Sequence, residues 1–143
     1  MSAETTIPEN FSLTEHVTSF AFGEHISGAA FLGDIVGFAL GDGRVVLHEG
    51  EKSRELAAHQ GAVQVFAHND EALYTGGDDG RLLRIDVSGT IETIADEKGK
   101  WVDAVAISTA GAIAWSAGRS VKARDKQGGL REIAAPSSVR GLA

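Results

Sequence analysis

The chain has 143 residues, a length typical of one domain, with 43% hydrophobic residues and a formal net charge of −7. Its acidic and basic residues are dispersed, which argues against the basic surface that nucleic acid or an anionic membrane would require. The absence of cysteine excludes disulfides and thiolate metal sites, and no apolar run approaches the length of a membrane span.

The N-terminal region is predicted to be a flexible tail over residues 1–12, followed by a strand over residues 13–22. The stretch Val17–Phe22 alternates polar and apolar residues, as a half-buried strand does. Residues 1–16 are polar and acidic and lack the basic start and apolar core of a signal peptide. We therefore expect a cytoplasmic protein.

A repeat with a period of 37–39 residues follows this strand. Its anchors are Ile26, Val63, Val102 and Val139. Alanine stands four residues after every anchor, and glycine stands seventeen residues after the first two, at Gly43 and Gly80. A period near 40 residues with strand-like content is typical of the blades of a β-propeller.

The second copy of the repeat shows the pattern best. Four short strands separated by glycine- and aspartate-rich turns are predicted over residues 63–67, 72–75, 81–86 and 90–95. Four antiparallel strands in about 39 residues form one propeller blade. We predict blades over about 26–58, 63–95 and 102–135, with the next blade beginning at 139–143. A helical repeat is disfavoured because glycine recurs inside the candidate segments.

The motifs resemble those of the WD-repeat β-propeller family. They are Ala-His-Gln-Gly-Ala-Val at 58–63 and Leu-Tyr-Thr-Gly-Gly-Asp-Asp-Gly-Arg-Leu-Leu-Arg-Ile-Asp at 73–86, with counterparts at 41–49 and 121–125. The resemblance covers about residues 13–143 and suggests the N-terminal part of a bacterial-type WD-repeat protein. The repeats are atypical, because each lacks the family's tryptophan before the closing acid.

The resemblance implies a structural hydrogen-bonded tetrad in the second blade. His59 would pair with Asp79, and Asp79 would meet the hydroxyl of Thr75. The histidine position holds Phe22, Lys98 and Ala135 in the other copies. The same three residue types also form catalytic triads. A structural role is favoured here, because a strand threonine without an oxyanion hole is a poor nucleophile.

The fold class is therefore predicted as all-β, an incomplete β-propeller of about three four-stranded antiparallel blades plus a closing strand. In the family an N-terminal strand completes the last blade, and residues 13–22 resemble that strand. Three blades do not close a ring, since propellers have four to eight. We expect a second polypeptide, most simply the remainder of the propeller, to pair with 139–143 and 13–22. A ring of identical chains is the alternative.

A docking point is predicted on the narrow face of the propeller, where partners of this family bind. Lys100 and Trp101 lie in the loop that enters the third blade, with Asp103 beside them. Gln64 and Arg140 occupy the corresponding rim positions of neighbouring blades. Tryptophan is the residue most enriched at interface hot spots.

The sequence favours a non-catalytic scaffold for protein–protein interaction, with no catalytic residues, no cofactor and no metal site. The five histidines have no spacing typical of metal ligands. The alternative is a propeller-type enzyme, a hydrolase or lyase, with its active site in the central channel and completed by residues outside this chain. The polar second residues of the first strands, at Ser27, Gln64, Asp103 and Arg140, would face that channel.

Overall fold

The computed structural model describes residue 15 and residues 17–143, and expectations for residues 1–14 and 16 lie outside this range. The described residues form twelve strands and no α-helix. The strands are β1 (Ile26–Leu32), β2 (Ile35–Leu40), β3 (Arg44–Glu49), β4 (Lys52–Ala57), β5 (Val63–His68), β6 (Ala72–Gly77), β7 (Arg81–Asp86), β8 (Ile91–Asp96), β9 (Val102–Ile107), β10 (Ile113–Ala117), β11 (Ser120–Arg124) and β12 (Leu130–Ala134).

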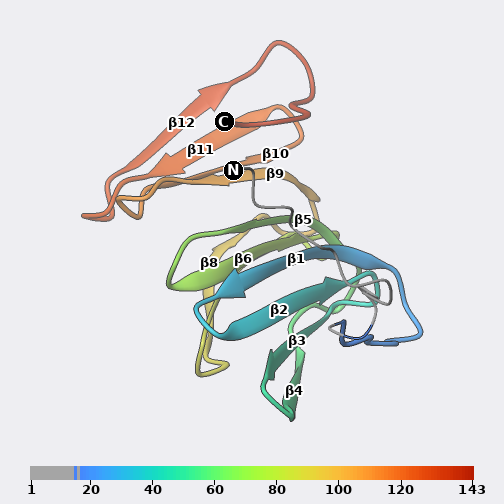
Figure 1. Ribbon diagram of the computed structural model, residues 1–143. Helices are drawn as coiled ribbons and strands as arrows, with labels where there is room; N and C mark the ends of the chain where they lie inside the picture. Colours follow the sequence, from blue (N-terminus) through green and yellow to red (C-terminus); the bar gives the residue numbers. More distant parts are fainter. Residues whose placement is uncertain (1–14, 16) are drawn as a thin grey trace, which may run out of the picture.

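The strands form three four-stranded antiparallel sheets, each built from four consecutive strands in chain order. Figure 1 shows the sheets stacked in chain order, with β1–β4 and β9–β12 at opposite ends of the stack. They span residues 26–57, 63–96 and 102–134. We call them blades 1, 2 and 3. The predicted fold class is confirmed: the chain is all-β, built of propeller blades, and the ring is open.

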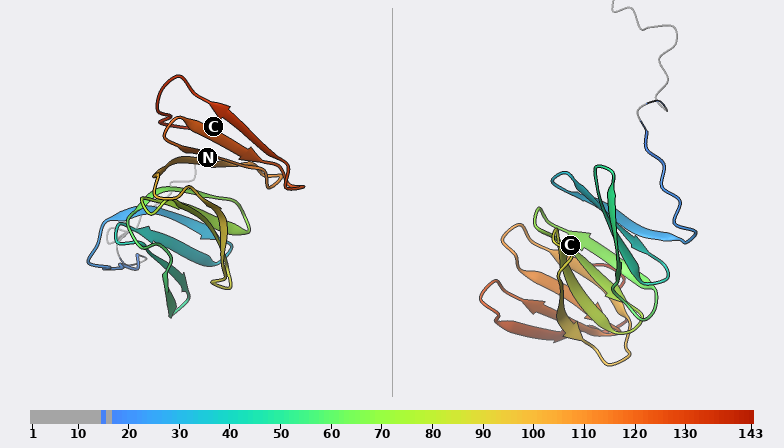
Figure 2. Two further views of the ribbon diagram at one scale, coloured as in Figure 1. Left: turned by 180° about the vertical axis from the view of Figure 1, so that it is seen from behind. Right: turned by 90° about the horizontal axis from the view of Figure 1, so that it is seen from below.

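The first strand of each blade lies on the inner side of the stack. β5 contacts both β1 and β9, so the three first strands follow one another around a common axis (Figure 2). The outermost strands β4 and β12 are largely exposed. The middle blade is covered on both sides, and all six residues of β6 are buried.

Two apolar cores lie between successive sheets. The first joins blades 1 and 2 through Leu32, Val45, Leu73 and Leu83 among others. The second joins blades 2 and 3 through Tyr74, Leu82, Ile113 and Trp115 among others. Burying one such side chain contributes roughly 1.5–3 kcal/mol, so the stacking of blades, and not the single sheet, supplies the stability.

Two turn glycines explain part of the repeat. Gly43 and Gly80 have φ of +91° and +82°, which other residues rarely adopt. A Cβ on Gly43 would also meet the carbonyl oxygens of His59 and Gly61, and one on Gly80 would lie 2.8 Å from the amide nitrogen of Gly99. Glycine recurs because the loop that enters the next blade lies directly over this turn.

The two end segments form no β-ladder in the described residues. Val17–Phe22 packs Phe20 and Phe22 on Phe38, with ring centroids 5.3 and 5.0 Å apart. Residues 139–143, predicted to begin a further blade, are tied by the Val139 amide, which donates to Gly118 O at 3.3 Å. A strand needs a partner strand, and the described residues offer none at these places. Pairing of these segments with a further polypeptide stays a prediction.

Candidate functional site

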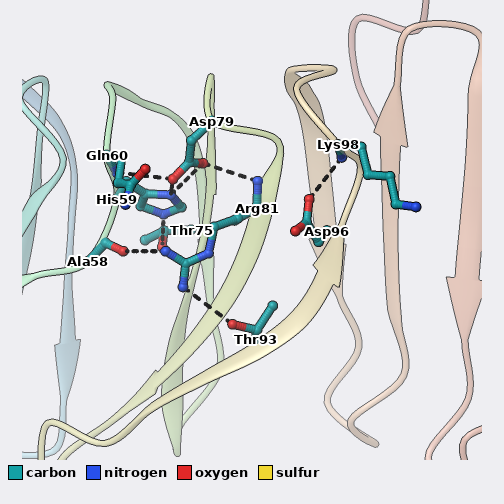
Figure 3. A network of polar contacts seen from close by, with 9 residues as sticks. All are labelled: Ala58, His59, Gln60, Thr75, Asp79, Arg81, Thr93, Asp96 and Lys98. Atoms are coloured by element: carbon teal, nitrogen blue, oxygen red, sulfur yellow. Dashed lines mark hydrogen bonds and ion pairs between the residues drawn. The ribbon is translucent and has the colours of Figure 1, made fainter.

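The polar cluster predicted for blade 2 is centred on His59, in the loop that enters the blade. Its ring is buried between the β6–β7 turn and β6 (Figure 3). Nδ1 lies 3.0 and 3.2 Å from the two carboxylate oxygens of Asp79, and Nε2 lies 2.8 Å from Oγ1 of Thr75. The structure thus brings the three residues together. The connectivity differs from the prediction, because Thr75 contacts the imidazole and not Asp79.

Asp79 also holds two backbone amides. Arg81 N donates to Oδ1 at 3.1 Å and Gln60 N donates to Oδ2 at 3.1 Å. Burial raises the pKa of Asp79, but the hydrogen bonds from Arg81 N, His59 and Gln60 N outweigh it and hold the pKa below its usual value. The ionised carboxylate therefore fastens the entry loop to the turn of the same blade.

The cluster has the residue types of a catalytic triad, but its hydroxyl is inaccessible. Thr75 has no exposed surface. Both ring nitrogens of His59 are engaged, and the carboxylate of Asp79 accepts two backbone amides beside its contact with the imidazole. This geometry suits a structural contact between the entry loop and the blade.

An equivalent contact exists in every blade, with different chemistry. Thr75 stands opposite Phe66 in the ladder, as Phe38 stands opposite Ala29 and Trp115 opposite Val105. Each second-strand residue meets one residue of the preceding segment. The pairs are Phe22 with Phe38 at a 5.0 Å centroid distance, His59 with Thr75, and Glu97 with Trp115, whose Nε1 donates to Oε1 at 2.8 Å. We call these three pairs the entry contacts.

The third blade corrects the sequence alignment. The predicted counterpart of His59 is Lys98, whereas the structure places Glu97 there. The amides of His59 and Glu97 make the same bond, to the turn carbonyls of Gly43 and Gly80 at 3.0 and 2.7 Å. Glu97 lies five residues before its anchor Val102, whereas His59 lies four residues before Val63. Lys98 absorbs the extra residue with φ of 52° and donates its amide to Asp96.

Glu97 forms a second polar cluster that the sequence did not reveal. Lys122 Nζ lies 2.8 and 3.0 Å from its carboxylate oxygens, and Lys122 faces Trp115 in the ladder. Burial raises the pKa of Glu97, but the bonds from Lys122 and Trp115 lower it more. The bond to Glu97 raises the pKa of Lys122. The sequence gives no local signal for this pair, because Lys122 stands with Ser120 and Arg124 at the polar positions of its alternating strand.

The positions predicted to face the channel coincide with a repeated irregularity. The ladder between the first two strands shifts register around Ser27, Gln64 and Asp103, one residue into each first strand. Such a β-bulge re-aims a side chain. Ser27 Oγ donates to Val63 O of the next blade at 2.8 Å, and Asp103 Oδ2 accepts from Gly118 N at 2.8 Å. Gln64 is exposed.

The predicted docking residues divide into two groups. Trp101 is 57% exposed, and Lys100, Gln64 and Arg140 are also exposed. Asp103 is half-buried and engaged by the Gly118 amide. No hydrogen bond or ion pair links these five side chains to one another within the described range. Lys100 also lines a groove of about 450 Å³ with Gly118, Arg119, Ser120, Ala117, Glu132 and Ala134.

Residue 15 and residues 17–143 contain no group of three His, Cys, Asp or Glu side chains placed to hold a metal ion. In the same part of the chain no helix is long and apolar enough to cross a membrane. His16, one of the five histidines considered above, lies outside the described residues.

Known structures identify the architecture. The chain is similar to the computationally designed Ika4 protein, with a TM-score of 0.74 and 21% identity over 86% of this chain and 81% of that one. It is also similar to the WD40 β-propeller domain of Doa1, with a TM-score of 0.66 and 20% identity over 82% of this chain and 44% of that one.

A third similar structure is a chain of a mitotic checkpoint complex, with a TM-score of 0.69 and 20% identity over 87% of this chain and 42% of that one. The chain has a β-propeller fold. It spans less than half the length of the two natural propeller chains. No protein-family model and no curated protein sequence matches it.

Replacing His59 with alanine should lower the free energy of unfolding by about 1–3 kcal/mol, because it strands the buried Thr75 hydroxyl and the Asp79 carboxylate. Chemical denaturation of the purified chain measures the change. His68→Ala, at an exposed position on β5, is the matched control and should stay within about 0.5 kcal/mol. Equal stability of the two variants would remove His59 from the structural role.

The Glu97 cluster should make stability depend on pH. The pKa of Glu97 is lowered in the folded chain from 4.5, so its contribution is present above that pH and is lost as the pH falls through the folded pKa. Denaturation measured from pH 7 down to pH 3 should therefore show that the free energy of unfolding falls less steeply with pH for Glu97→Gln than for the native chain. Glu51→Gln, in the exposed β3–β4 turn, should retain the native slope. Identical slopes for all three proteins would contradict the assignment.

Proposed function

We propose that this propeller is a non-catalytic scaffold of the WD-repeat kind that binds other proteins. The observation that carries the proposal is the exposed indole of Trp101 at the entry to blade 3. Similar solved structures include a WD40 domain and a chain of a multiprotein checkpoint complex, which supports the same class of function. The proposal includes the bacterial-type WD-repeat membership and the cytoplasmic location expected from the sequence.

The Trp101 loop is held from both sides. Glu97 is fixed by Trp115 and Lys122, and Val102, directly after the indole, is fully buried in the core between blades 2 and 3. A large aromatic side chain on a fixed backbone loses little conformational entropy on binding. Lys100 adds a positive charge beside it, which can steer an acidic segment of the partner.

The groove beside Lys100 extends this surface along the narrow face. It is bordered by the β10–β11 turn at Gly118–Ser120 and by Glu132 on β12. An aromatic anchor next to a groove that carries charged residues such as Lys100, Arg119 and Glu132 is the arrangement of a protein-binding hot spot with its rim. Gln64 and Arg140 belong to the proposed rim, whereas Asp103 supports the loop through the Gly118 amide.

The described residues give little support to the alternative that this chain is an enzyme. Asp103 is the one acid among the channel-facing positions Ser27, Gln64 and Asp103, and its carboxylate is engaged by a backbone amide of its own blade. A hydrolase or lyase site would need several acids or histidines converging on the channel. The binding function is therefore the better supported proposal.

Trp101→Ala should weaken partner binding by about 2 kcal/mol or more, the scale of a hot-spot residue. A photo-reactive amino acid at the exposed rim position 64, which leaves Trp101 in place, identifies the partner, and calorimetry with the purified pair measures the affinity. Leu130→Ala is the control, because Leu130 is similarly exposed, at 60% against 57%, but lies on the outermost strand β12. Unchanged affinity with Trp101→Ala, at unchanged thermal stability, would place the interface elsewhere.

A further inference from the structure

A groove of about 560 Å³ lies between blades 2 and 3. It is bordered by the β5–β6 and β9–β10 turns, so it opens at the end of β9 opposite to Trp101 and shares no lining residue with the groove beside Lys100. Its floor is apolar, because Tyr74 and Ile113 belong to the second core. The groove is therefore a second concave surface, separate from the one proposed above.

Two arginines stand in this groove at positions where the neighbouring interface has apolar residues. By ladder register, Arg84 corresponds to Leu47 of blade 1, and Arg124 corresponds to Ile85 of blade 2. Leu47 and Ile85 are 5% and 0% exposed and pack in the core between blades 1 and 2. Arg84 and Arg124 are half-buried and line the groove from opposite blades. Two guanidinium groups repel each other, so the blades stay apart where the first interface is closed.

The wall that blade 2 forms is acidic. It carries Asp70 and Glu71 in the β5–β6 turn and Glu92 on β8. Its one base, Arg84, faces Glu92 in the ladder, and its Nη2 lies 3.8 Å from Oε2 of Glu71. Three acids around one base leave this wall with a surplus of negative charge.

The wall that blade 3 forms is basic. Arg124 and Lys126 are the only charged side chains that this blade contributes to the groove. Within the described residues, the one ion pair of the groove is that of Arg84 with Glu71, and none crosses from one wall to the other. Opposite charges thus face each other across the groove without pairing. An occupant with cations toward blade 2 and anions toward blade 3 would complement both walls.

We propose that this groove binds an extended peptide segment in which basic and acidic side chains alternate. Successive side chains of an extended strand point to opposite sides, so its lysines or arginines would face the acidic wall and its aspartates or glutamates the basic wall. The aliphatic stems of the long side chains would pack on the apolar floor at Tyr74 and Ile113. A segment of one charge sign does not fit, because one of the two walls repels it.

Fluorescence anisotropy of the full chain with a labelled Lys-Glu-Lys-Glu-Lys-Glu peptide tests this proposal at low salt, where exposed charges are little screened. The alternating peptide should bind about fivefold or more tightly than Lys-Lys-Lys-Glu-Glu-Glu, which has the same composition but cannot present one sign to each wall. Equal binding of the two peptides, or binding of neither, would overturn the proposal. So would tighter binding of an all-Glu or an all-Lys peptide of the same length.

Charge reversal tests where the peptide binds. Glu92→Lys and Lys126→Glu each change an exposed residue of one wall and should weaken binding of the alternating peptide about threefold or more, because an attraction becomes a repulsion. Glu51→Lys and Arg131→Glu make the same charge changes at exposed positions outside the groove and should leave the affinity unchanged. Trp101→Ala should also leave it unchanged, which separates this site from the surface around Trp101. Native affinity in both wall variants, with the native circular dichroism spectrum, would overturn the proposal.

Discussion

Every blade of this molecule is a four-stranded sheet with two apolar faces, and this constraint governs the rest of the structure. Such a sheet is not stable by itself, because one face or the other would remain in water. The middle blade satisfies the constraint completely, with β6 buried along its whole length. The outer blades satisfy it on one side. The molecule is therefore organised as a stack in which stability arises between sheets.

Stacking requires the faces to be complementary in size. The backbone of blade 1 approaches Phe66 and Leu73 of blade 2 closely at Gly28 and Gly37. The alanines found four residues after each anchor, at Ala30, Ala67 and Ala106, lie on the same face of their blades as these two glycines. Bulky residues at these positions would separate successive blades and empty the cores between them.

The entry contacts show how one geometric position accepts different chemistry. The position is filled by an aromatic pair in blade 1, by an imidazole and a hydroxyl in blade 2, and by a carboxylate with an indole in blade 3. Each version removes surface from water and satisfies its polar groups, which is what burial demands. The proposed binding loop depends on the third version, because Glu97 lies four residues before Trp101.

Much of the fold was predictable from the sequence, because the repeat records local constraints. The turn glycines and the alternation of strand residues locate the blades to within a residue or so of the observed sheets. The site was predictable where a family motif exists, at His59, Thr75 and Asp79. Glu97 was missed because the one-residue insertion at Lys98 shifts the alignment, and Lys122 gives no local signal. The partners of the open faces are not encoded in any local pattern.

A double-mutant cycle between Gly37 and Leu73 tests the size rule between blades most directly. Gly37→Ala should cost about 1–3 kcal/mol through overpacking, and Leu73→Ala about 2–5 kcal/mol through a cavity. The double variant should be at least about 1 kcal/mol more stable than the sum of the single effects, because the new methyl group occupies part of the cavity. Unfolding free energies that add to within about 0.5 kcal/mol would contradict the account.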